Sequence, residues 1–76
     1  MSNELTLTRT AQVAANIRAE LARQRVSQRS LAVGLGMSPA ALSNRLSGAT
    51  PIDVNELGAI ADALGVSASA LLGVAA

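Results

Sequence analysis

No aromatic residue occurs in this chain of 76 residues, so its core must consist of aliphatic side chains. Half of the residues are hydrophobic, and most of these are Ala and Leu. Both rank high in helix propensity, whereas strands favour the β-branched and aromatic residues that are scarce or missing here. A chain this short forms one domain at most and buries only about 60% of its unfolded surface. The composition predicts a marginally stable all-α domain that pairing with a second copy would stabilise.

The chain also lacks His and Cys, which excludes zinc sites of the usual ligand sets, thiol nucleophiles and imidazole bases. We therefore expect no enzyme activity, no metal, no cofactor and no small-molecule substrate. No run of about 18 apolar residues occurs, and the opening MSNELTLTRT lacks the basic start and apolar run of a signal peptide. With no disulfide possible, these features predict a soluble cytoplasmic protein that does not contact a membrane.

Charge is divided unevenly along the chain. All six cationic side chains are arginines that precede residue 50, so residues 1–50 carry a net charge of +4 and residues 51–76 one of −3. One part of the fold can therefore face a polyanion while the other faces away. The planar fork of arginine suits phosphates and guanine edges. The alternative is a solvated surface on which genome composition favours Arg over Lys.

Apolar spacing and capping residues predict five short helices. Apolar positions recur at three- and four-residue steps over residues 10–25, which indicates an amphipathic helix preceded by a flexible arm over residues 1–9. Ser27 is a suitable N-cap for a second helix of about two turns, which ends near Gly36.

The later helices have clear starts. Ser38 followed by Pro39 is the order of cap and proline typical of a first helical turn. Asp53 and Glu56 form a variant of the capping box at the start of the fourth helix, and Ser67 can cap a short last helix. The expected organisation is a flexible arm (1–9), a helical domain (10–73) and a C-terminal tail (74–76).

The second and third helices are joined by only a few residues around Gly36. This is the helix-turn-helix arrangement, in which the second of the two helices lies in the major groove of DNA. Ala32 supplies a small side chain where the helices cross, Gly36 can adopt positive φ in the turn, and Leu42 is an apolar anchor. The spacing predicts DNA binding, although it also arises by chance in chains rich in Ala and Leu.

The stretch SQRSLAVGLGMSPAALSNRLSG, followed by ELGAIADALGVSASALLG, resembles the Cro/C1-type (lambda-repressor-like) helix-turn-helix family. The resemblance covers roughly residues 12–73. It implies a compact five-helix DNA-binding domain with the helix-turn-helix formed by the second and third helices. It also implies a sequence-specific transcriptional regulator, a phage repressor or Cro-like protein, that binds operator half-sites on double-stranded DNA.

By this resemblance, the recognition helix covers residues 38–47. Family members usually read bases at its first, second and sixth positions, which match Pro39, Ala40 and Asn44 here. Pro39 and Ala40 offer only apolar contact, for instance to a thymine methyl group, whereas Asn44 can pair with adenine for about 1–3 kcal/mol of discrimination. The alternative for Asn44 is an exposed residue with no partner. The residues expected at the bases are Ser38, Pro39, Ala40, Ser43 and Asn44.

Phosphate contacts are expected around the recognition helix. The resemblance assigns one to Gln28 at the start of the second helix. Arg29 lies in the same first turn, where a cation is unfavourable for the helix dipole but close to DNA. Arg18 and Arg25 are seven residues apart and are expected to share a face of the first helix. Arg45 stands where the family commonly has an apolar or aromatic residue, so it either reaches the DNA backbone or lies on the solvent side.

Relatives often pair an Arg on the first helix with a Glu near the end of the third. The matching positions here are Leu21 and Leu46, which we expect to touch in a hydrophobic contact that replaces the ion pair. Truncation of either leucine to Ala should then cost about 2–5 kcal/mol.

Few phosphate contacts are available per copy, so specific binding is expected to need a homodimer on half-sites about one helical turn apart. The dimer surface is expected at Leu71, Leu72 and Val74, and the dimer forms either in solution or only on DNA. Those leucines could equally close the core over the first helix. Two other functions stay open: a restriction-modification controller or antitoxin that represses its own operon, and a protein-binding bundle that does not touch DNA.

Overall fold

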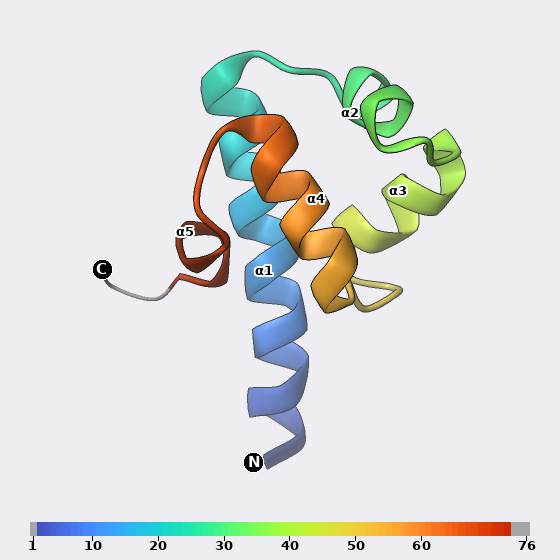
Figure 1. The fold of residues 1–76 in the computed structure, drawn as a ribbon. Coiled ribbons are helices and arrows are strands. Elements are labelled where there is room, and N and C mark those ends of the chain that lie inside the picture. The colour runs from blue at the N-terminus through green and yellow to red at the C-terminus, as the bar shows by residue number, and fades with distance from the viewer. Residues whose placement is uncertain (1, 74–76) are drawn as a thin grey trace.

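In a computed structural model, the chain folds into a small bundle of helices (Figure 1). The structure describes residues 2–73, with side chains from Arg9 onward. Within this part of the chain all regular structure is helical, as the composition predicts, and no helix combines the length and apolar character that a membrane span requires. The helices are α1 (Ser2–Gln24), α2 (Gln28–Leu35), α3 (Pro39–Leu46), α4 (Val54–Leu64) and α5 (Ala68–Leu72).

Helix α1 is longer than the spacing of apolar residues predicts. It begins at Ser2, so residues 2–9, expected as a loose arm, form its first turns and extend past the rest of the bundle (Figure 1). The physical reason is that this segment contains neither Gly nor Pro, so nothing in it interrupts a helix. The flexibility of the segment and the domain limits stay predictions.

Side-chain caps define where the other helices start. The hydroxyl oxygens of Ser27, Ser38 and Ser67 each accept a hydrogen bond from the backbone N–H three residues later, at 3.0–3.1 Å. At α4 the capping box is complete, because Asp53 Oδ1 accepts from the Glu56 N–H at 2.7 Å and Glu56 Oε1 accepts from the Asp53 N–H at 3.1 Å. These are the caps predicted from the sequence, and each is worth about 0.5–2 kcal/mol.

The core is aliphatic and receives side chains from all five helices. Both positions of the expected Leu21–Leu46 pair are buried in it. No described polar side chain is buried, so the fold depends on hydrophobic packing rather than on a buried polar network. The largest fully buried side chains are Ile17, Leu42, Leu46, Ile60 and Leu71.

Candidate nucleic-acid interface

The turn between α2 and α3 consists of residues 36–38. Gly36 has a φ of +66°, and the N–H groups of Gly36 and Met37 donate to the carbonyl oxygens of Val33 and Ala32 at 3.1 and 2.9 Å. These bonds close the end of α2 in a left-handed conformation that glycine adopts without strain. The space around Gly36 is open, so conformation rather than crowding favours glycine there. The predicted helix-turn-helix is confirmed.

Helix α3 has two contrasting faces. Leu42 and Leu46 are at most 1% exposed and anchor one face in the core. The residues expected at the bases lie on the outside of the molecule, because each of them is exposed. They are Ser38, Pro39, Ala40, Ser43 and Asn44.

Asn44 contributes its backbone, rather than its side chain, to the fold. Its carbonyl oxygen accepts hydrogen bonds from the N–H groups of Ala49 and Thr50 at 3.0 and 3.1 Å, and from Ser47 Oγ at 3.0 Å. Its side chain is exposed, and no described residue forms a hydrogen bond with its amide group. The backbone therefore holds the end of α3 while the amide presents a donor and an acceptor to solvent, as a bidentate contact with a base requires.

A polar concavity of about 290 Å³ lies between α1, α2 and the C-terminal end of α3. It is lined by Arg18, Gln28, Ser43, Leu46 and Ser47. Arg18 Nη1 donates to the carbonyl oxygen of Leu46, so the guanidinium lies at a helix C-terminus, where it interacts favourably with the helix dipole. The fold therefore brings together Arg18, Gln28 and Ser43, which the sequence predicts separately on three helices.

Ser47 also lines this concavity, although no sequence pattern selected it. It lies four residues after Ser43 and is the C-cap of α3. Residues at this spacing are neighbours on a helix surface, so the i, i+4 relation to Ser43 is the signal that could have found it.

The comparison with known families agrees with this geometry. The helix-turn-helix family model HTH_3 matches residues 17–71, a range that includes α2, the turn and α3. The chain belongs to this helix-turn-helix family. It is the Cro/C1-type family that the motif resembles, and membership makes the chain a DNA-binding protein of a family that is not catalytic. No curated protein and no solved structure matches the chain.

Two further arginines expected at phosphates in this helix-turn-helix protein, Arg25 and Arg29, are exposed near the start of α2. Helix α1 ends at Gln24, and Arg25 has a φ of +58°. The expectation that Arg25 shares a helix face with Arg18 is therefore wrong, because the chain leaves the helix one residue earlier.

Arg45 makes an ion pair that connects α3 to α4. Its Nε and Nη2 lie 3.0 and 2.9 Å from Glu56 Oε2, and its Nη1 donates to the carbonyl oxygen of Ala41 at 2.9 Å. The hydrogen bond from Arg45, followed by that from the Asp53 N–H, holds the pKa of the Glu56 carboxyl below its ordinary value of 4.5. The sequence does not reveal this pairing because it joins residues on different helices. The ion pair with Glu56 means that Arg45 helps to hold α3 against α4.

The residues expected at a dimer surface lie in different environments. Leu71 is 2% exposed, and its carbonyl oxygen accepts from Asn16 Nδ2 at 2.9 Å. The expectation that Leu71 lies at the surface is wrong, because α5 packs against α1 with this side chain in the core, as the alternative interpretation of these leucines held. Leu72 is 44% exposed, and Val74 lies outside the described residues.

Proposed function

We propose that this protein is a sequence-specific regulator of transcription that binds operator DNA through the major groove. The observation that carries the proposal is the geometry of α3. Leu42 and Leu46 hold one face in the core, while Ser43 and Asn44 are exposed. The major groove is wide enough to admit a helix presented in this way. Membership of the Cro/C1-type family favours a phage repressor or Cro-like protein.

Asn44 is the main base-reading residue in this proposal, because its exposed amide can donate to and accept from adenine at once. Ser43 is adjacent and also exposed. Ser38 can donate its hydroxyl proton to a base or phosphate, since its oxygen already accepts a backbone N–H. Pro39 and Ala40 supply apolar surface for a thymine methyl group.

The polar concavity is the first phosphate site. Arg18, Gln28 and Ser43 line it together and supply one positive charge with neutral donors beside it. Arg25 and Arg29, both exposed, bind the neighbouring DNA backbone near the start of α2.

Arg45 has a different part in this proposal. Three of its guanidinium nitrogens already interact with Glu56 or with the carbonyl oxygen of Ala41. A phosphate would have to share the guanidinium with these partners. Arg45 therefore contributes mainly by positioning α3, and its loss should change the salt dependence of binding less than the loss of Arg18.

Two copies on two half-sites complete the proposal. One copy offers few phosphate contacts, and non-specific affinity from such contacts is weak at physiological salt. Two recognition helices about 34 Å apart read half-sites in successive turns of the duplex. The operator should accordingly be a palindrome.

Selection of bound duplexes from a random pool tests this proposal. We expect enrichment of a two-fold symmetric site whose half-sites lie about one helical turn apart. Affinity for the selected duplex should fall with salt, and Arg18→Ala should reduce the log–log slope by about one per copy. Arg23→Ala is the matched control, because Arg23 is already paired with Glu20 on α1. No retention on duplex DNA at low salt would overturn the proposal and favour a protein-binding bundle.

A further inference from the structure

The exposed face of α3 changes character along its length. Pro39 lies four residues before Ser43, and residues at this spacing are neighbours on a helix surface. Ala40 stands in the same relation to Asn44, and all four side chains are exposed. In each pair the residue of the first turn is apolar and the residue of the second turn is polar. Helix α3 therefore presents an apolar start and a polar middle to its surroundings.

The backbone of the first turn adds little hydrogen-bonding capacity. Pro39 has no N–H group. The N–H groups of Ala41 and Leu42 donate to the hydroxyl and carbonyl oxygens of Ser38, both at 3.1 Å. Of the first N–H groups of α3, that of Ala40 alone forms no hydrogen bond with a described residue. The outer surface of this turn is therefore suited to an apolar contact rather than to a network of hydrogen bonds.

The start of α3 is also free of charge. No charged residue occurs between Arg29 and Arg45, and the first turn of α3 contains no acidic side chain. The cations proposed for the DNA backbone thus lie outside this stretch. An uncharged, apolar turn is suited to the interior of a groove, where base edges are met, rather than to phosphates.

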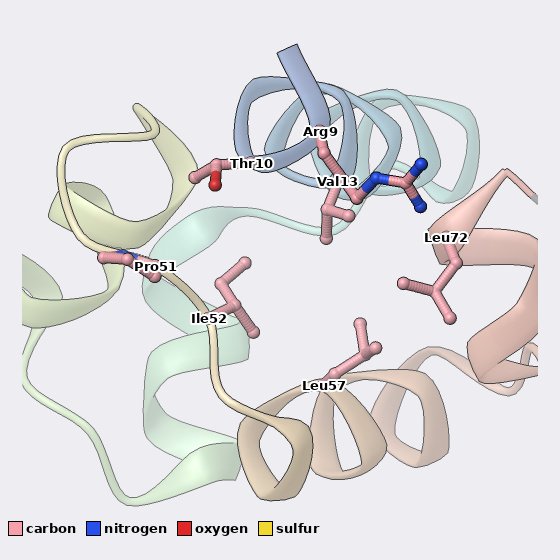
Figure 2. A pocket seen from close by; sticks show the side chains of 7 residues that line it. All are labelled: Arg9, Thr10, Val13, Pro51, Ile52, Leu57 and Leu72. Carbon is pink, nitrogen blue, oxygen red and sulfur yellow. The ribbon is translucent and has the colours of Figure 1, made fainter. Parts of the chain in front are cut away.

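Packing within the molecule does not account for this apolar turn. A separate apolar concavity of about 200 Å³ lies between α1, α4 and α5, and Figure 2 shows four side chains directed toward its centre: Val13, Ile52, Leu57 and Leu72. Pro39 and Ala40 line neither this concavity nor the polar one, and they do not pack against the core. Their apolar surface is available to a partner.

We infer that the first turn of α3 recognises the 5-methyl group of a pyrimidine, so that 5-methylcytosine can take the place of thymine. This inference rests on the proposed function. The methyl group at C5 is the apolar group that a base pair presents in the major groove. Methylation of cytosine at C5 puts the same group at the same position. Binding would then depend on the methylation state of the DNA, because Pro39 and Ala40 contact the methyl group rather than the polar edge of the base.

The geometry of α3 predicts where the methyl group lies in the site. Ala40 and Asn44 are four residues apart, which corresponds to about 6 Å along a helix axis. Successive base pairs are about 3.4 Å apart. The methylated pyrimidine should therefore lie within about two base pairs of the adenine that Asn44 is proposed to read.

Replacement of single bases in the selected operator tests the inference. Uracil differs from thymine only in lacking the methyl group, so each thymine is replaced in turn by uracil. At one position in each half-site the affinity should fall about fourfold, the equivalent of about 0.8 kcal/mol for one buried carbon group. When that T·A pair is replaced by C·G, 5-methylcytosine should bind about fourfold more tightly than cytosine.

A variant of the first turn assigns the effect to these side chains. The double substitution Pro39→Ala, Ala40→Gly removes apolar carbon from the turn, and Ala59→Gly is the matched control at an exposed position of α4. The double variant should lose less than about twofold on replacement of thymine by uracil, whereas Ala59→Gly should keep the loss of about fourfold. Each comparison is a ratio of two affinities of one protein, so a change in its stability cancels.

Three results would each overturn the inference. They are tolerance of uracil at every thymine, equal affinity for cytosine and 5-methylcytosine, and an unchanged uracil penalty in the double variant. A parent protein that selects an operator but ignores methyl groups would reject this inference alone. Failure of the parent to bind any duplex would reject the proposed function itself.

Discussion

Arg25 has a φ of +58°, in the left-handed region that costs a residue with a side chain about 1–2 kcal/mol. Among the described residues, the other positive φ values belong to glycines. Glycine is the favoured residue at a helix end of this kind. Backbone strain of this sort is typical of functional positions. In the proposed function, Arg25 stands at this strained position because its guanidinium contacts a phosphate.

Replacement of Arg25 by Gly should therefore raise stability and weaken DNA binding. We expect Arg25→Gly to gain about 0.5–1 kcal/mol in the free energy of unfolding, because relief of strain outweighs the added freedom of the unfolded chain. The salt slope of DNA binding should fall by about one per copy. Thermal unfolding and salt-dependent binding measure the two effects.

The control for this substitution is Arg25→Ala, which removes the charge but keeps the strain. It should lower the salt slope equally without the gain in stability. If Arg25→Gly were less stable than the parent, the left-handed conformation would not be strained, and if the salt slope were unchanged, Arg25 would not contact phosphate.

The Arg45–Glu56 ion pair should make part of the free energy of unfolding depend on pH. Because the folded protein lowers the pKa of Glu56, the pair stabilises the fold above the ordinary pKa of 4.5, and this contribution is lost as pH falls through the folded value. Glu56→Gln keeps an acceptor for the capping box but removes the charge. It should unfold at a lower temperature than the parent at neutral pH, with a difference that shrinks in acid.

Thermal unfolding from neutral to strongly acid pH measures this difference. Asp62→Asn is the matched control, since it neutralises an exposed carboxylate on the same helix. A deficit for Glu56→Gln that stays constant across the range would show that its cause is not the ionised pair.

At the scale of elements, helix starts could be predicted where their signals are local. Ser38 and Asp53 lie next to the backbone groups that they cap, so the sequence is enough to identify them. The start of α1 could not be predicted from the sequence. Residues 2–9 contain no Gly or Pro to mark a helix boundary, and their apolar residues do not recur at helical spacing. The sequence also leaves open which of the adjacent Leu71 and Leu72 enters the core, since that depends on how α5 packs against α1.

Helix α3 relies on Leu46, which is 1% exposed. Leu46→Ala should lower the free energy of unfolding by about 2–5 kcal/mol, a large part of the 5–15 kcal/mol typical of a whole domain. Urea denaturation measures this loss. Val33→Ala, at a position 76% exposed on α2, is the control and should change stability by no more than about 0.5 kcal/mol. A loss for Leu46→Ala as small as that of the control would show that burial of the Leu46 side chain does not hold α3 in place.

At the scale of the whole molecule, the division of charge along the sequence only partly predicts the charge available for DNA. Among the described residues, salt bridges engage Arg23 with Glu20 and Arg45 with Glu56. The first pair is visible in the sequence as an i, i+3 spacing, whereas the second depends on how α3 packs against α4. Four other arginines remain, and the three of them proposed for the DNA backbone are Arg18, Arg25 and Arg29.

The most direct test of the account is a base-substitution scan of the selected operator with the parent protein, Asn44→Ala and Asn55→Ala. Asn55 is an exposed asparagine on α4 and serves as the matched control. We predict that the parent and Asn55→Ala favour adenine at one position of each half-site by about 1–3 kcal/mol. Asn44→Ala should lose this preference at that position and keep discrimination elsewhere. Full discrimination by Asn44→Ala at every base pair would contradict the claim that α3 reads DNA through this residue.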